Sequence, residues 1–403
     1  MGEWREVDLD EVASELTVGH VGPMVSEYRD EGVPFIRSTD IEPFRIKRDQ
    51  LKYINPEFHS RLKKSALKPG DVVIVRTGKP GTCAMIPVDL PDANCSDVVI
   101  VRTGPELDPR YLAYYINSAA RAHIDAFSGG AVQQHFNVGA ARRIRMNLPP
   151  IGEQERIVQV LGNLDAKIDL LHRQNKTLEA MTETLFRQWF VERRPEVLEG
   201  EAEEGWEEGT LDQILSVRGG TTPSTKNPEF WDGDIHWTTP RDLSSASDIF
   251  LFDTARKITA KGLAEIGSGL SPSGTLLMSS RAPVGYLAFA DMPIAVNQGY
   301  IVIIDDKGVG KHFIYLWLKA NMDLVHSYAN GSTFQEISKS AFKTMELTIP
   351  PTTRVADFED TVKPLFMKIR ANLVQVQKLT ALRDTLLPKL MSGEVRVGQM
   401  KKT

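Results

Sequence analysis

The sequence from Pro149 to Arg194 reads PPIGEQERIVQVLGNLDAKIDLLHRQNKTLEAMTETLFRQWFVERR. Large apolar residues recur in it at alternating intervals of four and three, at Ile157, Leu161, Leu164, Ile168, Leu171, Leu178, Leu185 and Trp189. Asn175 and Thr182 are the two polar residues of the alternation. An apolar period of 3.5 residues keeps one side of a helix against a partner helix. The pattern predicts a coiled-coil helix of roughly 50 Å over residues 157–189. An amphipathic helix on a globular core is the alternative.

The bulk composition is that of a soluble protein with more than one domain. The chain has 403 residues, of which 41% are apolar and 25% are charged, as in ordinary globular proteins. No apolar run has the length of a membrane span, and the first residues, MGEWREVDLDEV, are acidic and unlike a signal peptide. Cys83 and Cys95 lie outside any CxxC motif, which favours buried thiols over metal ligands or a disulfide. We therefore expect a cytoplasmic protein without a cofactor or a metal.

The chain contains an internal repeat. The matching segments, in pairs, are EWREVDLDEVA (3–13) with GWEEGTLDQIL (205–215), GVPFIRSTDIE (32–42) with GDIHWTTPRDLS (233–244), LKPGDVVIVRTGKPGTCAMI (67–86) with LSPSGTLLMSSRAPVGYLAF (270–289), and FSGGAVQQHFNVGAARRIRMNLPP (127–150) with YANGSTFQEISKSAFKTMELTIPP (328–351). The offset between matching residues stays between 201 and 203 along these segments. Chance does not explain so constant an offset.

A second apolar seam follows from the same offset of 201. Eight of its ten residues are apolar, namely Phe358, Val362, Leu365, Ile369, Val376, Leu379, Leu386 and Leu390. The other two are Asn372 and Arg383. A polar residue in a seam lowers stability and can fix the register of the two helices. A frayed or hydrated position is the alternative for each of these polar residues.

The order along the chain is therefore domain, long helix, domain, long helix. We place the parts at residues 1–149, 150–194, 205–350 and 351–397, with an acidic linker at 195–204. Short β-rich runs such as DVVIVRTG and GYIVIID, separated by turn residues, predict an α+β fold with a mostly antiparallel or mixed sheet in each domain. One helix is predicted in each domain, at 109–127 and at 311–329.

Motifs of the common enzyme families are absent from the sequence. GVGKH (308–312) lacks the first glycine of a phosphate loop and the Ser or Thr after its lysine, and no GxGxxG, HExxH or GxSxG occurs. The paired prolines at 149–150 and 350–351 end a strand and begin a helix. The sequence favours a binding protein over an enzyme.

Local charge and recurring polar loops indicate what could be bound. Residues 37–79 carry eleven basic and five acidic side chains, which suits contacts with phosphates. A solvated lysine-rich surface is the alternative. Three polar loops recur at equivalent places in the two halves: IRSTD (36–40) with WTTPRD (237–242), VRTGKPG (75–81) with SSRAPVG (279–285), and GGAVQQHF (129–136) with GSTFQEIS (331–338). Their side chains are of the types that hydrogen-bond base edges. The predicted DNA-binding residues are Arg37, Ser38, Thr39, Arg76, Thr77, Lys79, Gln133, Gln134, His135, Thr238, Thr239, Arg241, Ser279, Ser280, Arg281, Thr333 and Gln335.

Three segments resemble type I restriction-modification specificity subunits. GSTFQEISKSAFKTMELTIPP (331–351) resembles their Gly-Ser-Thr…Ile-Ser…Ile-Pro-Pro block, PPIGEQERIVQVLGNLDAKI (149–168) the opening of their spacer helices, and LRDTLLPKLMSGEVRV (382–397) their C-terminal end. The resemblance implies two similar target-recognition domains related by a pseudo-two-fold repeat, each reading one half of a split sequence in double-stranded DNA. It also implies two helices that pair as an antiparallel coiled coil and set the gap.

The same resemblance implies partners. It predicts that DNA methyltransferase subunits, two in number, and motor-nuclease (restriction) subunits dock on a non-catalytic subunit. A stand-alone methyltransferase or nuclease with divergent motifs remains an alternative, as does a coiled-coil scaffold without a DNA role.

The sequence departs from the family pattern in two places. The second helix opens PTTRVADFEDTVKPLF (351–366) in place of P-x-x-E-Q, and it contains Pro364. Since proline removes a backbone donor and clashes with the preceding turn, we expect a break near Val362 and a restart of the helix at about Pro364. In the first half GGAVQQH (129–135) replaces Gly-Ser-Thr-Phe-Gln-Glu, so the resemblance assigns a specific role less safely to 129–135 than to Gly331–Ile337.

Overall fold

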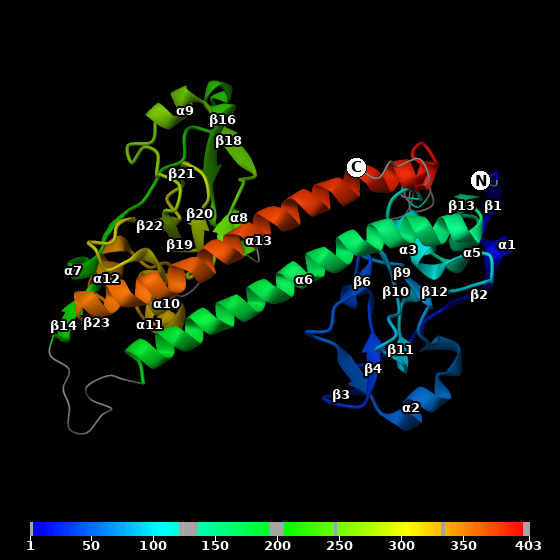
Figure 1. The fold of residues 1–403 in the computed structure, drawn as a ribbon. Helices are drawn as coiled ribbons and strands as arrows, with labels where there is room; N and C mark the ends of the chain where they lie inside the picture. The colour runs from blue at the N-terminus through cyan, green and yellow to red at the C-terminus, as the bar shows by residue number, and fades with distance from the viewer. Residues whose placement is uncertain are drawn as a thin grey trace. The chain divides into compact units, whose positions relative to one another are not determined.

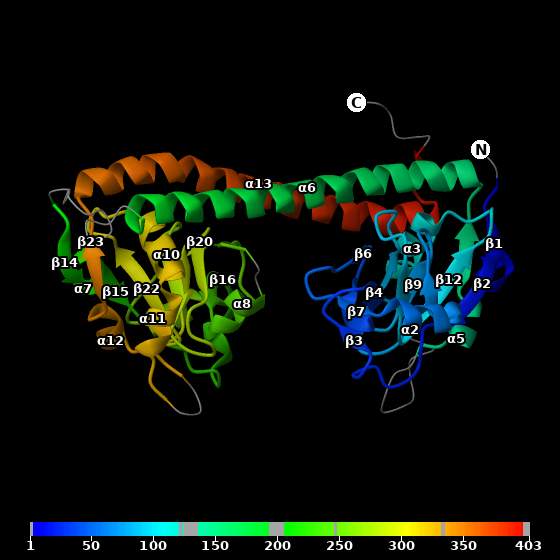
Figure 2. The same ribbon diagram turned by 90° about the horizontal axis from the view of Figure 1, so that it is seen from below.

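The computed structural model describes residues 3–120, 124, 136–192, 205–245, 248–331 and 335–397. The chain divides into two compact units, residues 1–170 with 376–403 (unit 1) and residues 171–375 (unit 2). The two long helices, α6 (Ile151–Phe190) and α13 (Thr352–Ser392), each contribute one part to each unit. Within each unit these two helix segments run side by side in opposite directions (Figures 1 and 2). Two α+β units with an antiparallel helix pair confirm the predicted fold class.

Unit 1 is built on two main sheets. Its strands are β1 (Arg5–Asp8), β2 (Ala13–Val18), β3 (Tyr28–Arg29), β4 (Val33–Ile36), β5 (Ile41–Glu42), β6 (Arg45–Ile46), β7 (Lys52–Ile54), β8 (Ala66–Leu67), β9 (Val72–Val75), β10 (Cys83–Met85), β11 (Ala93–Cys95), β12 (Val98–Thr103) and β13 (Arg145–Leu148). One sheet has the order β10-β9-β12-β2 and the other β3-β7-β4-β11-β8. The pairing of β11 with β4 is parallel and the other pairings are antiparallel, so the first sheet is antiparallel and the second is mixed. Both cysteines are free and buried.

Short helices complete unit 1. They are α1 (Leu9–Val12), η1 (Ser38–Asp40), α2 (Pro56–Arg61), η2 (Lys63–Ser65), α3 (Pro109–Asn117) and α5 (Val138–Arg142). α3 ends at Asn117, earlier than the predicted helix at 109–127, most of whose remaining residues lie outside the described ranges. Tyr111, Leu112 and Ile116 of α3 are buried in the same apolar core as Ile157 and Leu161 of α6. The long helix is therefore part of the core of the unit.

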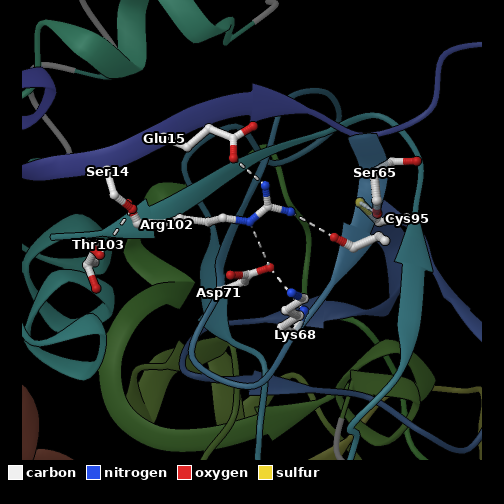
Figure 3. Close-up of polar contacts among 9 residues, drawn as sticks. Ser14, Glu15, Ser65, Lys68, Asp71, Cys95, Arg102 and Thr103 are labelled. Atoms are coloured by element: carbon white, nitrogen blue, oxygen red, sulfur yellow. Dashed lines mark hydrogen bonds and ion pairs between the residues drawn. The ribbon is translucent and has the colours of Figure 1, made fainter. Parts of the chain in front are cut away.

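The side chain of Arg102 on β12 ties the two sheets of unit 1 together (Figure 3). Its guanidinium donates to Glu15 on β2 and to the carbonyl of Ala66 on β8 at 2.9 Å. Its Nε lies 3.5 Å from Asp71, whose carboxylate also accepts the backbone N–H of Lys68. Burial raises the pKa of Asp71, and the nearby Lys68 and Arg102 offset only part of that shift. One arginine thus satisfies polar groups from several segments of the unit.

Unit 2 repeats this plan, with an eight-residue β16 where unit 1 has the four-residue β4. Its strands are β14 (Glu207–Thr210), β15 (Ser216–Arg218), β16 (Trp231–Thr238), β17 (Phe250–Leu251), β18 (Arg256–Ile258), β19 (Leu276–Ser279), β20 (Leu287–Ala290), β21 (Ile294–Val296), β22 (Tyr300–Asp305) and β23 (Glu346–Ile349). The sheets have the orders β15-β22-β19-β20-β17 and β18-β16-β21. The β14–β23 pair leads into α13 as the β1–β13 pair leads into α6.

The helices of unit 2 correct one prediction. They are α7 (Leu211–Ile214), η3 (Pro228–Phe230), α8 (Pro240–Ser245), α9 (Ala260–Ala264), α10 (Lys311–Ala320), α11 (Met322–Ser327) and α12 (Lys339–Lys343). The single helix predicted at 311–329 is two helices, because the chain leaves the helical conformation at Asn321 (φ −113°, ψ 30°). The amide of Asn321 donates to the carbonyl of Trp317 at 2.8 Å. An asparagine side chain that competes for backbone groups in this way favours a helix end.

A polar residue near the start of each long helix fastens the helix to its unit. Gln154 of α6 is fully buried. It accepts the backbone N–H of Asp108 at 2.9 Å and donates to the carbonyls of Glu106 and Pro149, both at 2.8 Å. At an offset of 201 the second half has Val355, which cannot make these bonds. Glu359, one turn later, accepts the N–H groups of His312 and Phe313 at the start of α10.

The predicted break in the second long helix is wrong. α13 is continuous from Thr352 to Ser392 and contains both Pro364 and Pro388. Pro364 is on the exposed side of the helix, as is Asp360, so water can hydrate the carbonyl that loses its intrahelical partner. On the other side Val362, Phe366 and Ile369 are at most 1% exposed. Burial of these apolar side chains, about 1.5–3 kcal/mol each, outweighs a cost of about 3 kcal/mol for an interior proline.

Candidate nucleic-acid interface

Three backbone hydrogen bonds recur at equivalent places and define one loop cluster in each unit. In unit 1 they are Ser96 N to Ile36 O, Phe136 N to Arg76 O and Gly81 N to Val75 O. In unit 2 they are Asn297 N to Thr238 O, Ile337 N to Ser280 O and Gly285 N to Ser279 O. The cluster joins the end of β4 or β16, the loop after β9 or β19, and the turn after β11 or β21. These are the polar loops that the repeat singled out.

The same bonds correct the match between the longer segments at 67–86 and 270–289. Gly81 and Gly285 make the same bond and both have positive φ, 83° and 100°. Arg76 corresponds to Ser280 in the same way, so the offset is 204 and the sequence match was one residue out of step. The glycine sets the alignment because only glycine adopts this conformation at little cost.

Turn 297–299, between β21 and β22, lies at the centre of the cluster in unit 2. The carbonyl of Gly299 accepts the N–H of Ser280 at 2.8 Å, and the side chain of Asn297 accepts the N–H of Gly299 at 2.8 Å. A Cβ on Gly299 would lie 2.8 Å from the ring of Pro240, so no larger residue fits there without a shift. The turn is therefore held from two sides, and Gln298 is exposed at its tip.

Gln298 is joined to the segment that follows β15. Thr222 Oγ1 donates to Gln298 Oε1 at 2.7 Å. The neighbouring Gly220 lies so close to the carbonyl of Val296 that any Cβ would overlap it, at 1.8 Å. Gly19 of unit 1 approaches Cys95 in the same way, with a Cβ at 2.9 Å from the thiol. The segment after β15 in unit 2 and the segment after β2 in unit 1 thus each pass close to the strand before the turn.

Arg281 and Glu336 join the loop after β19 to the chain before α12. Their backbones form an isolated antiparallel bridge, and Arg281 Nη1 lies 3.7 Å from Glu336 Oε2. The N–H and carbonyl of Glu336 also pair with Asn330 at 2.9 Å. Gln335, next to this bridge, is exposed. Its side chain can meet a ligand at the edge of the cluster.

In unit 1 the residue at the position of Gln298 is Asp97. Its carboxylate accepts the hydroxyl of Thr77 and lies 3.2 Å from Arg76 Nη1. Its backbone N–H donates to the carbonyl of His20 at 3.2 Å. Arg76 Nε is buried and has no hydrogen-bond partner among the described residues. The two units therefore place different chemistry, an anion with its cation and a neutral amide, on the same turn.

Three of the residues predicted to contact bases have buried side chains. Thr238 and Ser279 are fully buried, and Ser280 is 3% exposed. Thr238 Oγ1 lies 3.0 Å from the hydroxyl of Tyr300, and burial raises the pKa of that phenol. Ser279 Oγ donates to the carbonyl of Pro283 and accepts the N–H of Tyr286, both at 2.8 Å. Buried hydroxyls need such partners, and these two hold the loops in shape.

Arg37 is also committed within the protein. Its Nε and Nη2 donate to the two carboxylate oxygens of Asp40, at 2.8 and 2.6 Å, and its Nη2 donates to the carbonyl of Gln50 at 3.0 Å. The hydrogen bond with Asp40 raises the pKa of Arg37. Three of the five N–H donors of the guanidinium thus close the turn around η1.

The other predicted DNA-binding residues fall into three groups. Those with exposed side chains are Thr39, Lys79, Arg241 and Gln335. Those with half-buried side chains are Ser38, Arg76, Thr77, Thr239 and Arg281. Gln133, Gln134, His135 and Thr333 lie outside the described residues. Thr239 also holds the carboxylate of Asp242 through its N–H, at 2.7 Å.

The basic segment 37–79 is partly neutralised. Five of its eleven cations lie within ion-pair distance of a carboxylate, namely Arg37, Arg45, Lys47, Arg48 and Arg76. Within the ranges that the structure describes, no carboxylate is within that distance of the other six, which are Lys52, Arg61, Lys63, Lys64, Lys68 and Lys79. All six are exposed. Phosphate contacts are therefore expected from this second group.

Sequence reasoning missed Asp97, Gln298 and Thr222. A signal was present, since Asp97 and Gln298 are polar residues at the offset of 201 directly after buried strands. The DNA-binding residues were predicted from the three matched loops, and this turn is not part of them. Thr222 carried no such signal, because its partner is 76 positions away.

The predicted helix-pairing residues of α6 and α13 are all buried or half-buried. Those that are buried are Ile157, Leu161, Ile168, Leu171, Asn175, Ile369, Asn372 and Leu390. Those that are half-buried are Leu164, Leu178, Leu185, Trp189, Leu365, Val376, Leu379 and Leu386. Neighbouring residues that were not predicted, among them Val158, Phe186 and Phe366, are buried as well. They extend the seam into the cores of the two units.

The polar seam residues have specific partners. Asn372 Nδ2 donates to Asn175 Oδ1 at 2.8 Å, and Asn372 Oδ1 is buried without a partner among the described residues. Thr182 donates to the carbonyl of Glu179 in its own helix. Arg383 donates to Asp165 at 2.9 Å, and Asp165 also accepts the hydroxyl of Tyr114. Asn175 with Asn372 in unit 2, and Asp165 with Arg383 in unit 1, fit one antiparallel register.

The described residues contain neither a membrane-spanning helix nor a metal-binding cluster. No helix in the described ranges is long and apolar enough to cross a membrane. No group of three or more metal-binding side chains occurs among the described residues.

Comparison with known proteins identifies relatives along the whole chain. The chain is 38% identical over 153 residues to the type I restriction enzyme MjaIX specificity subunit of Methanocaldococcus jannaschii, a match that spans 38% of this chain and 35% of that protein. It is 24% identical to the type I restriction enzyme HindI specificity subunit of Haemophilus influenzae, over 98% of this chain and all of that protein. The fold is similar to that of the type I restriction-modification S subunit from M. genitalium, with a TM-score of 0.61, 15% identity and 96% of each chain covered.

A family match accounts for both halves of the repeat. Residues 1–180 and 203–357 each match the type I restriction modification DNA specificity domain. Together these ranges cover most of the 403 residues and include both loop clusters. The chain therefore belongs to the family of type I restriction-modification DNA specificity subunits and carries two copies of their specificity domain.

Proposed function

We propose that this chain recognises a bipartite sequence in double-stranded DNA, with each unit reading one half through its loop cluster. One observation carries the proposal. The DNA specificity domain matches twice, and the two loop clusters share their backbone hydrogen bonds while Asp97 in one stands where Gln298 stands in the other. Two loop clusters with the same backbone hydrogen bonds but different side chains suit the recognition of two different short DNA sequences.

The chain acts without catalysis of its own. Methyltransferase subunits, one for each half-site, carry out adenine methylation with their own methyl donor, and a motor-nuclease subunit joins for cleavage. The exposed lysines and arginine of 52–79 contact phosphates, which position the protein but carry no sequence information. Such contacts make affinity fall steeply with salt. Because its substrate is cellular DNA, we place the protein in the cytoplasm.

The paired helices act as a ruler between the half-sites. Asn175 with Asn372 and Asp165 with Arg383 support one antiparallel register, and a fixed register gives the spacer a fixed length. A rise of 1.5 Å per residue in the helix and of 3.4 Å per base pair in DNA relate the two lengths. The gap is therefore a property of α6 and α13, separate from the bases that are read.

Methylome sequencing tests the proposal. The chain is expressed with its methyltransferase subunit in cells that lack other adenine methylation, and methylated positions are mapped. We expect one motif made of two short half-sites with a constant unread gap. Methylation at a continuous motif, or at none, contradicts the proposal. Methylation or cleavage by the purified chain alone would show instead that it is an enzyme.

A further inference from the structure

The tip of turn 297–299 is built to hold one polar side chain in a fixed place. Asn297 N is bonded to the end of β16, Gly299 O to the loop after β19, and Gly299 packs against Pro240. Of the three residues of the turn, Gln298 alone has an exposed side chain. Since two segments fix the backbone, the position of this side chain varies little, and little entropy is lost when it binds.

The amide of Gln298 is also oriented. Its Oε1 accepts the hydroxyl of Thr222 at 2.7 Å, and Nε2 has no hydrogen-bond partner among the described residues. An amide has two donor hydrogens and two acceptor lone pairs. Both hydrogens of Nε2 and one lone pair of Oε1 therefore remain for a ligand. A neighbouring donor and acceptor of this kind match N7 and N6 of adenine in the major groove.

We infer that Gln298 is a specificity-determining residue of unit 2 and that it reads an adenine in one half-site. Its Nε2–H donates to N7 and its Oε1 accepts from the N6 amino group, while Thr222 holds the amide in plane. This inference rests on the proposed function and goes further by naming the residue and the base. Asp97, at the same place in unit 1, has no donor, which accords with a different half-site.

Two substitutions test the inference in the complete complex with its methyltransferase subunit. Gln298→Ala removes the contact, and we expect one adenine position of one half-site to become degenerate, with preference reduced roughly tenfold or more. Gln298→Glu keeps the size of the side chain but replaces the amino donors with an acceptor. It is expected to lose adenine and to favour cytosine at that position, since a carboxylate accepts from N4 of cytosine.

Two further variants control for folding and orientation. Thr222→Val keeps the shape of Thr222 and removes its hydroxyl, so the same adenine should be read with a weaker preference. Gln375→Ala changes an exposed glutamine on α13 outside the cluster and should leave the motif unchanged. Methylome sequencing and competition with duplexes changed at one base pair give the readout for all four variants.

The outcomes separate this inference from the proposed function. A wild-type complex with no bipartite motif would overturn the proposed function and with it the role of Gln298. A bipartite wild-type motif that both Gln298 variants leave unchanged would overturn the inference alone. If Gln298→Ala abolishes methylation altogether, Gln298→Glu decides, since its motif either changes at one position or does not.

Discussion

Glu153 and Arg354 occupy the same position in the two units, with opposite charge, and each closes the start of a long helix. Glu153 accepts Trp4 Nε1 at 3.1 Å and lies 3.0 and 3.1 Å from Arg396 Nη1. Arg354 donates to the carbonyl of Trp189 at 3.1 and 3.0 Å, and its guanidinium lies 5.8 Å from the ring of Trp206. The opposite charges match different partners. In unit 1 the partner is the cation Arg396, and in unit 2 it is the carbonyl of Trp189 at the end of α6.

The contacts of Glu153 with Trp4 and Arg396 predict that Glu153→Ala destabilises unit 1 by about 2 kcal/mol. The carboxylate is 4% exposed, and its loss leaves the mostly buried Arg396 and the indole N–H of Trp4 without a partner. Thermal and urea unfolding followed by circular dichroism measure the effect. Glu155→Ala, an exposed neighbour on the same helix, is the control. Equal stability of the two variants would show that the contacts of Glu153 do not stabilise unit 1.

The two long helices and the repeated domains could be predicted from the apolar period and the internal repeat. The helix break and the exposure of the loop residues could not. The 4-3 alternation over 157–189 and its copy at the offset of 201 predicted both long helices, since burial of an apolar seam depends on spacing alone. The break predicted at Pro364 does not occur, because the cost of the proline is local whereas the burial of Val362 and Phe366 that offsets it involves residues distant in the sequence. Which polar loop residues face solvent could not be predicted either. Thr238 and Ser279 are of the right type to read bases, but both are buried: Thr238 bonds to Tyr300, 62 positions away, and Ser279 donates to the carbonyl of Pro283 in its own loop.

The asparagine pair predicts opposite effects for single and double substitutions. Asn372→Leu leaves the amide of Asn175 buried without its closest partner, and we expect a loss of about 1 kcal/mol. Replacing both by Leu removes the unpaired Asn372 Oδ1 as well and should raise Tm above that of the wild type. The double variant should also loosen the register of the helices. A double variant as unstable as the single one contradicts this account.

Gln335 predicts modular readout. It is exposed beside the Arg281–Glu336 bridge of unit 2, so Gln335→Ala should weaken or relax one half-site only, by roughly tenfold if the lost contact is bidentate. Methylome sequencing of the variant complex gives both half-sites in one experiment. Gln188→Ala, at an exposed position of α6, serves as the comparison. Equal losses at both half-sites would contradict the modular account.

Asp248 predicts a pH-dependent stability of unit 2. Burial raises the pKa of this carboxyl, and His172 opposes the shift. The folded state therefore holds the proton more tightly than the unfolded state, and stability falls as pH rises from the ordinary pKa of 3.8 through the raised one. Asp248→Asn removes the charge and should stabilise the protein at pH 7. Solvent screening of this partly exposed group keeps the gain below about 1 kcal/mol. The gain should vanish near pH 4, and Asp323→Asn, at an exposed position, should show no such trend.

The ruler predicts that spacer length and base recognition can be changed separately. In the register set by Asn175 and Asn372, the junction after His172 lies opposite the junction after Val374. Inserting one heptad at both junctions keeps the seam in phase and leaves the cores of both units intact. Seven residues lengthen each helix by roughly 10 Å, which corresponds to about three base pairs. We expect methylome sequencing to show both half-sites unchanged and the gap longer by about that amount.

A heptad inserted in α6 alone shifts the register of its seam against that of α13 and should abolish methylation. Changed half-sites with an unchanged gap would refute the ruler.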